Sequence, residues 1–218
     1  MVQHRLRPLL CPRSVAIVGA SPKQSTFGWM SYRALADSGF NGDIHLINPR
    51  YDEIDERPCL PNLAAIEKPV DHAMLNVANA RVEAVLDDAI AAGIPAVTIF
   101  SSGYLENDTD PPLLVRLRTK AQGAGLMVCG GNGSGFVNYD EGTQVTLASG
   151  NASKDPGSIT LISQSGSIYG GLVQNDGRLK FNLTITAGQE IATTTADYMD
   201  YALELPSTRA IALYIETI

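Results

Sequence analysis

Short apolar and β-branched runs alternate with longer segments of helical periodicity from Ser14 to about Gly130. Such alternation is typical of a parallel sheet covered by helices. Strands are expected at residues 14–20, 43–48, 72–78, 96–102 and 126–130. Residues 80–93 repeat apolar side chains every three or four positions and end at Gly93, which predicts the best helix of the chain. A second helix is expected over 111–123, where the leading prolines suit a first turn.

A second series of the same kind begins near Pro156. Its strands are expected at 158–163, 182–187 and 209–216, and its helices at 166–175 and 194–205. Residues 131–157 are rich in Gly, Asn, Ser and Asp, and we interpret them as a connector with one short strand, TQVTLA at 143–148. A doubly wound domain rarely finishes on an uncovered strand, so we interpret the chain as an excised portion of a longer protein.

Composition and charge exclude several classes of protein. The formal net charge is −7 over 218 residues and no basic run occurs, which argues against a nucleic-acid partner. No window reaches the roughly 18 apolar residues of a membrane span, and the first ten residues lack the apolar core of a signal peptide. We therefore expect a cytoplasmic protein without a membrane partner. Cys11, Cys59 and Cys129 are far apart, which predicts free thiols and no metal site.

The turn after the first expected strand has the residues of a phosphate site. Gly19 to Pro22 are small, so backbone N–H groups can approach a diphosphate, and a helix beginning near residue 26 or 27 adds its positive end. Arg50 follows the second strand, where an NAD-binding domain usually has an acidic residue. A cation there suits a ligand with a further ribose phosphate, either NADP or coenzyme A. Alternatively, Gly19 and Gly28 only permit close packing and Arg50 is a solvated charge.

A second glycine-containing turn, Ser163 to Ser167, lies between an expected strand and an expected helix. Hydroxyl groups beside a helix N-terminus suit a phosphoryl group that is bound or transferred. The alternative, favoured when the turn is taken alone, is that Ser165 caps the helix. A serine-hydrolase turn is excluded, because Ser163 stands where that motif needs glycine.

Six segments taken together resemble the NDP-forming acyl-CoA synthetases, which are similar to the alpha subunit of succinyl-CoA synthetase. They are LLCPRSVAIVGASP at 9–22, INPR at 47–50, FSSGYLE at 100–106, GGNGSGFVN at 130–138, PGSITLISQSG at 156–166 and TRAIALYIE at 208–216. The resemblance implies an α/β fold, with a Rossmann-like CoA-binding domain over 1–150 and the first part of a flavodoxin-like parallel domain over 156–218. It also implies a ligase that makes acyl-CoA through an acyl phosphate and a phosphohistidine.

The resemblance implies a set of residues that bind CoA. They are Gly19, Ala20, Ser21 and Pro22 at the phosphate turn, Arg50 beside the nucleotide, Val77, Ala78, Asn79, Ser101, Ser102 and Gly103 along the groove, and Asn132 near the pantetheine end. The chain departs from the family at three of these places. Ala78 stands where the family commonly has proline, and Gly131 and Gly133 replace a proline and a cysteine. A looser groove wall and a changed thiol end are expected from these departures.

The resemblance also implies catalytic residues in the second half of the chain. Ser163, Ser165 and Gly166 match the helix start that faces the phosphohistidine, and Glu216 matches the glutamate that contacts this histidine. Such a carboxylate accepts a hydrogen bond from one ring nitrogen and makes the other more basic. From its position alone, Glu216 is a solvated residue near a chain end.

The histidine of the family belongs to an S-H-T-G-like segment that would follow Ile218. His4, His45 and His72 do not replace it, and we expect structural roles for all three. In the full enzyme the partners are a carboxylic acid and an ATP-grasp domain or subunit that uses ATP or GTP with Mg; a homo-oligomer is a further expectation. The chain alone is expected to bind CoA without completing the ligase cycle. The alternatives are a stand-alone CoA-binding or regulatory module and an NADP-dependent oxidoreductase.

Overall fold

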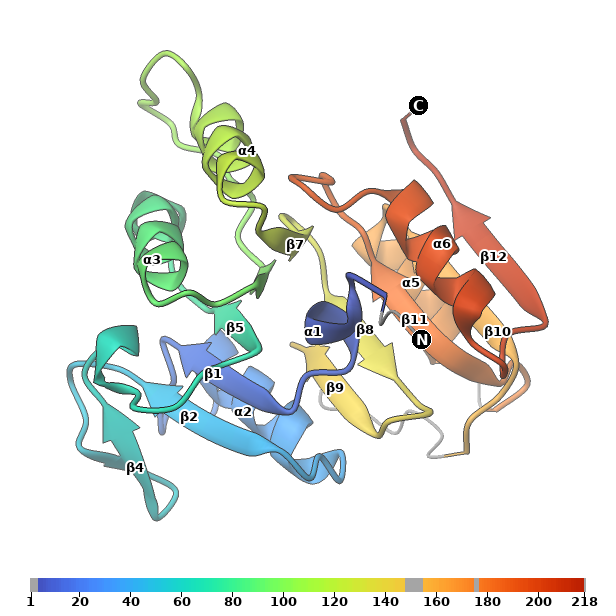
Figure 1. The fold of residues 1–218 in the computed structure, drawn as a ribbon, viewed down its shortest axis with the longest axis horizontal. Coiled ribbons are helices and arrows are strands. Elements are labelled where there is room, and N and C mark those ends of the chain that lie inside the picture. Colours follow the sequence, from blue (N-terminus) through green and yellow to red (C-terminus); the bar gives the residue numbers. More distant parts are fainter. Residues whose placement is uncertain (1–3, 148–154, 175–176, 218) are drawn as a thin grey trace.

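A computed structural model describes residues 4–147, 155–174 and 177–217. It contains two sheets that lie next to each other (Figure 1). The first has the strand order β3-β4-β2-β1-β5-β6-β7, and the second β12-β10-β11-β8-β9. An α/β architecture with largely parallel pairing is therefore confirmed.

The first sheet is built from buried apolar strands. Its strands are β1 (Ser14–Val18), β2 (Asp43–Ile47), β3 (Glu53–Ile54), β4 (Arg57–Leu60), β5 (His72–Leu75), β6 (Ala96–Ile99) and β7 (Met127–Gly130). Every residue of β1, β5, β6 and β7 is buried, as expected for parallel strands covered on both faces. The order of strands reverses at β1, which pairs with β2 on one side and β5 on the other. At such a point the carboxyl ends of the strands open a crevice.

Two helices of the first sheet lie close to the expected ranges 80–93 and 111–123 and a third begins at the expected position near residue 27, whereas the helices at 7–10 and 63–65 were not expected. The helices are α1 (Arg7–Leu10), α2 (Phe27–Asp37), α3 (Asn79–Ala91) and α4 (Leu113–Gly123), with a short 3-10 helix at Leu63–Ala65. Thr26 caps α2 by accepting a hydrogen bond from Trp29 N. The apolar face expected for α3 is buried, and α3 packs beside α4 (Figure 1).

The second sheet is larger than the sequence predicted. Its strands are β8 (Gly135–Asn138), β9 (Thr143–Thr146), β10 (Ile159–Ser163), β11 (Phe181–Thr186) and β12 (Ala210–Tyr214), and its helices are α5 (Gly166–Val173) and α6 (Thr195–Glu204). The connector was expected to hold one strand, and this prediction was wrong. It holds both β8 and β9, because β8 pairs antiparallel with β11 and thereby extends the sheet. Ala148 and Asn175, the last residues of an expected strand and helix, lie outside the described residues.

The titratable groups of the core have structural roles. His72 is fully buried, its Nε2 atom lies 2.9 Å from Thr98 Oγ1, and burial lowers its pKa to about 3. This ring is therefore neutral near pH 7, in agreement with the structural role expected for it. All three cysteines are free. Among the described residues no helix could cross a membrane and no cluster of three or more potential metal ligands occurs.

Candidate functional site

A pocket of about 180 Å³ lies at the carboxyl ends of β1, β2 and β5. Apolar and polar groups share its wall about equally, and the apolar side chains include Val18, Ile47, Leu63, Val77 and Val85. Asn48, Asn62, Arg81 and Asp88 supply polar groups at the same pocket. The combination suits a flat, apolar ring with polar edges, which is the character of a nucleobase. Gly19 and Val77 are the expected site residues that the structure places here.

The turn after β1 is shaped by glycine. Gly19 has a φ of +83°, and a Cβ atom at this position would lie 2.3 Å from the carbonyl oxygen of Asn76. A Cβ atom at Gly28 would lie 1.9 Å from Gly19 O. Strand, turn and α2 therefore reach backbone contact only because both residues are glycine. Both glycines therefore permit close packing of the backbone, which is the alternative role considered for them in the sequence.

The N–H groups of this turn are partly engaged within the sheet. Gly19 N and Ala20 N both donate to the carbonyl oxygen of Ile47, at 2.9 and 3.3 Å. A phosphate here would be bound by donors that follow them, where α2 begins with N–H groups that lack helical acceptors. Of the other expected turn residues, Ser21 is buried and Pro22 is exposed.

Asn48 joins the turn after β1 to the segment after β2. Its Nδ2 donates to Ala20 O at 2.7 Å, and its Oδ1 accepts from Arg50 N at 3.1 Å. Arg50 itself is exposed, and its guanidinium forms no ion pair with any residue that the structure describes. Arg50 follows Asn48 and Pro49, which line the pocket, and its guanidinium is free to bind an anionic ligand.

The expected groove residues after β5 and β6 are brought into direct contact. Asn79 Nδ2 donates to Ser102 Oγ at 3.0 Å, and Asn79 Oδ1 accepts from Gly103 N at 2.9 Å. Ala78 precedes α3 with a φ of −64°, the value to which proline is restricted. The backbone at Ala78 is therefore compatible with the proline that the family commonly has, and the looser wall expected from sequence stays a prediction.

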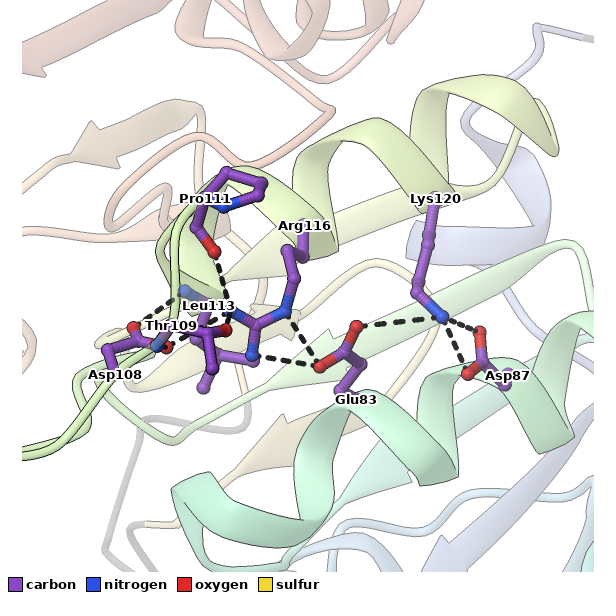
Figure 2. Close-up of polar contacts among 8 residues, drawn as sticks. All are labelled: Glu83, Asp87, Asp108, Thr109, Pro111, Leu113, Arg116 and Lys120. Atoms are coloured by element: carbon purple, nitrogen blue, oxygen red, sulfur yellow. Dashed lines mark hydrogen bonds and ion pairs between the residues drawn. The ribbon is translucent and has the colours of Figure 1, made fainter.

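An ion-pair network joins helices α3 and α4 and the segment that precedes α4 (Figure 2). Arg116 on α4 pairs with Glu83 on α3 at 3.0 Å and with Asp108 at 3.0 Å. Asp108 also accepts from Leu113 N at 2.7 Å. This backbone hydrogen bond lowers the pKa of the Asp108 carboxyl group, and the hydrogen bond from Arg116 lowers it further. The network fixes the segment that follows Gly103 to both helices.

Two further groups extend the same contact between helices α3 and α4. Lys120 Nζ lies 2.7 Å from each carboxylate oxygen of Asp87 and 3.6 Å from Glu83 Oε1 (Figure 2). The hydrogen bond to Asp87 raises the pKa of Lys120. Asp87 therefore has a structural partner, whereas its neighbour Asp88 faces the pocket.

The segment Gly130–Ser134, which we call the bridging turn, connects the two sheets. Asn132 is exposed at its tip with a φ of +56°, and Asn132 N donates to Ser101 O at 2.9 Å. A Cβ atom at Gly131 would lie 2.8 Å from Ser101 O, and one at Gly133 would lie 3.0 Å from Thr186 O. At both glycines that depart from the family pattern, backbone oxygen atoms thus leave little room for a side chain.

The turn before α5 is held by its own serine residues. Ser163 is fully buried; its Oγ donates to Ser165 O at 2.8 Å and accepts from Ser165 N at 3.1 Å. Ser165 is the N-cap residue of α5, but its side chain makes no capping hydrogen bond, so the capping alternative was wrong about its hydroxyl group. A Cβ atom at Gly166 would lie 3.3 Å from Ser134 Oγ, so the start of α5 faces the bridging turn.

Gln164 organises the carboxyl ends of the second sheet. Its Oε1 accepts from Glu216 N at 2.8 Å and from Thr217 N at 3.0 Å, and its Nε2 donates to Glu190 Oε1 at 2.9 Å. Glu190 also accepts from Thr195 Oγ1 at 2.6 Å. The side chain of Glu216 remains exposed.

Sequence reasoning missed several of these residues. Arg81 and Asp88 lie on α3, where periodicity indicated only a solvated face, although Arg81 follows the expected groove residues by two positions. Gln164 lies within the S-Q-S-G segment that resembles the family, and this resemblance could have identified it. Glu190 had no such signal, because its partner Gln164 is 26 positions away in sequence.

Fold and site together define a two-sheet α/β protein with a pocket at the carboxyl ends of its parallel strands. Residues 13–137 match the family described as CoA binding domain, and residues 156–218 match the succinyl-CoA ligase like flavodoxin domain. The chain belongs to the NDP-forming acyl-CoA synthetase family. The resemblance and the fold class drawn from the sequence are thereby confirmed. The boundaries 1–150 and 156–218 stay a prediction about folding units.

Named relatives agree with this family. The chain is 29% identical over 215 residues to the ADP-forming acetate–CoA ligase of Methanocaldococcus jannaschii, covering 98% of this chain and 30% of the relative. It is 28% identical to the subunit alpha of ADP-forming acetate–CoA ligase I of Pyrococcus furiosus, covering 97% and 47%. The structure of acetyl-coenzyme A synthetase 1 of Ca. Korarchaeum cryptofilum with phosphate and ADP superimposes with a TM-score of 0.89 at 28% identity, covering 99% and 46%. The chain thus spans less than half of each.

Proposed function

We propose that this chain binds coenzyme A at the first sheet and forms the CoA-binding portion of an NDP-forming acid–CoA ligase. The observation that carries the proposal is the pocket at the carboxyl ends of β1, β2 and β5, with the unpaired Arg50 beside it. CoA unites a nucleobase, a diphosphate and a ribose 3′-phosphate. The nucleobase fits the pocket, the diphosphate fits the start of α2, and the 3′-phosphate fits the Arg50 guanidinium.

The binding mode follows from the order of the strands. The adenine occupies the pocket, where Asn62 and Asp88 face its polar edge. The diphosphate lies at the turn from Gly19 to Pro22. The pantetheine arm then runs past Asn79 and the segment from Ser101 to Gly103, and its thiol end approaches Asn132. This direction follows the neighbouring strands β1, β5, β6 and β7 in turn.

The second sheet supplies the phosphate side of the proposed reaction. The start of α5, with the free Ser165 hydroxyl and Gly166, stabilises a phosphoryl group through its N–H groups and dipole. Glu216 orients the histidine of the whole protein through one ring nitrogen. In the acyl-transfer step the thiolate of CoA forms a C–S bond, the C–O bond of an acyl phosphate breaks, and phosphate leaves.

The remaining components belong to the whole protein in this proposal. The substrate is a carboxylic acid, as the names of the acetate–CoA ligases suggest. An ATP-grasp domain or subunit would supply ATP or GTP chemistry with Mg, and a cytoplasmic location and a homo-oligomer complete the proposal.

Parallel calorimetric titrations with CoA, dephospho-CoA, NAD and NADP test the first part. CoA is expected to bind saturably, and dephospho-CoA more weakly because it lacks the 3′-phosphate. Arg50→Ala is expected to weaken CoA binding by roughly tenfold or more, the worth of a hydrogen bond to a charged group. The same substitution is expected to leave dephospho-CoA binding nearly unchanged. Tight NADP binding without a response to CoA would overturn the proposal in favour of an oxidoreductase.

A further inference from the structure

Gln189 of the second sheet reaches the groove of the first. It follows β11, and its backbone N donates to Gly131 O of the bridging turn at 3.0 Å. Its side-chain Oε1 lies 3.1 Å from the position of a Cβ atom at Gly131 and 3.6 Å from that at Gly103. The amide is therefore next to the segment after β6 that carries Ser101.

Two polar atoms here have no protein partner. Gln189 Oε1 and Ser101 Oγ are both buried and accept or donate no hydrogen bond within the described part of the chain. Buried polar groups are usually paired, since an unpaired one costs about 1–3 kcal/mol. The Gln189 residue as a whole is partly exposed, although its Oε1 atom is buried. Such a pair of groups indicates a polar ligand between the two sheets.

We propose that the Gln189 side chain pairs with an amide group of the pantetheine arm of CoA. This inference rests on the proposed function and adds a contact from the second sheet to it. An amide presents one N–H donor and one carbonyl acceptor, which complement the carbonyl and NH₂ groups of Gln189. Ser101 supplies a hydroxyl that can donate to the same arm or accept from it. CoA is thus held by both sheets, its nucleotide by the first and its arm by Gln189.

The route fits the spacing of the strands. The proposed adenine pocket includes the end of β5, and the bridging turn follows β7, which is two strands further along the sheet. Two strand spacings correspond to roughly 10 Å. An extended pantetheine arm covers such a span, so one of its amides can reach Gln189 while the base stays in the pocket.

The test compares CoA with its nucleotide half, adenosine 3′-phosphate 5′-diphosphate, by calorimetry on the whole chain. Gln189→Met keeps the length of the side chain and removes the amide. It is expected to weaken CoA binding about fivefold, the net worth of roughly one neutral hydrogen bond. Binding of the nucleotide half is expected to stay unchanged. Gln122→Met, at an exposed glutamine of α4, is the matched control and leaves both affinities unchanged.

The other possible outcomes distinguish failure of this inference from failure of the proposed function. Equal CoA affinity in Gln189→Met and the wild type overturns the inference and leaves the proposed function standing. Equal weakening of both ligands also overturns it, since the effect is then not specific to the arm. Wild-type protein that binds neither ligand removes the proposed function and this inference with it. Gln189→Asn, whose shorter amide cannot reach the same point, repeats the test with a polar side chain, and thermal melting verifies folding of both variants.

Discussion

The carboxyl ends of the two sheets are built in different ways. In the first, Gly19, Gly28 and Asn76 meet through backbone atoms, and the pocket beside them has both apolar and polar walls. In the second, side chains make the connections, with Gln164 joining Glu190 to the end of β12. A site made by backbone packing has a fixed shape and accepts no added atom. A site made by side chains can be altered one hydrogen bond at a time.

The largest effect is expected at the backbone-packed end. Gly28→Ala places a methyl group 1.9 Å from a carbonyl oxygen, and we expect a loss of about 3 kcal/mol in the free energy of unfolding. Gly170→Ala in α5 is the matched control, because nothing lies within 4 Å of its Cβ position, and we expect a gain of about 0.5–1 kcal/mol. Urea unfolding measures both. Equal stability of the two variants would contradict the comparison.

The second-largest effect is the loss of stability at acidic pH that the buried His72 of the first sheet causes. Burial lowers the pKa of His72 to about 3, whereas an unfolded histidine ionises near pH 6.5. Between these values the unfolded chain binds a proton that the folded chain does not. The contribution of this neutral histidine to stability is complete above about pH 6.5 and falls as the pH decreases, by up to about 1.4 kcal/mol per pH unit.

Urea unfolding from about pH 7 to about pH 5 tests this, because carboxylates remain ionised there. His72→Gln is expected to show a smaller pH slope than the wild type. Burial lowers the pKa of His45 too, so part of the slope is expected to persist in this variant. An unchanged slope would show that His72 is accessible to protons in the folded state.

The smallest effect is expected at the side-chain-built end. Gln164→Leu removes the acceptor of Glu216 N and Thr217 N, and we expect a loss of about 1 kcal/mol together with local fraying of the end of β12. Amide hydrogen exchange should become faster at Glu216. It should stay unchanged at Arg209, whose N–H donates to the backbone oxygen of Ser158. Equal acceleration at both amides would mean that Gln164 supports the whole strand.

Periodicity predicted the elements whose burial follows from local pattern. The strand Ser14–Val18 is one continuous apolar run, and the helix Asn79–Ala91 has one clear apolar face. The strand Gly135–Asn138 was missed because its first and last residues are typical of loops. It becomes a strand through pairing with β11, some 45 residues away, as in the register of Asn138 with Leu183. Such long-range pairing leaves no local trace in the sequence.

The residues of the candidate site also differ in how far local sequence indicates them. The first turn and Arg50 could be recognised as candidates from the sequence, since small residues and a cation after buried strands suit a phosphate ligand, and their binding role stays a prediction. The role expected for Glu216 came from resemblance alone and stays a prediction. Gln189 could not be found from sequence, because its significance comes from two unpaired atoms that only the folded chain brings to one place.

The antiparallel pair of β8 and β9 has a practical consequence for dissecting the protein. These strands precede residue 148 in the chain and yet belong to the second sheet through β11. A fragment that ends near residue 150 would carry them without their partner, and a fragment that begins near residue 156 would expose the open edge of β11. Unpaired edges of this kind promote aggregation. A cut near residue 133 would instead keep β8 and β9 with the sheet they complete, at the expense of dividing the bridging turn.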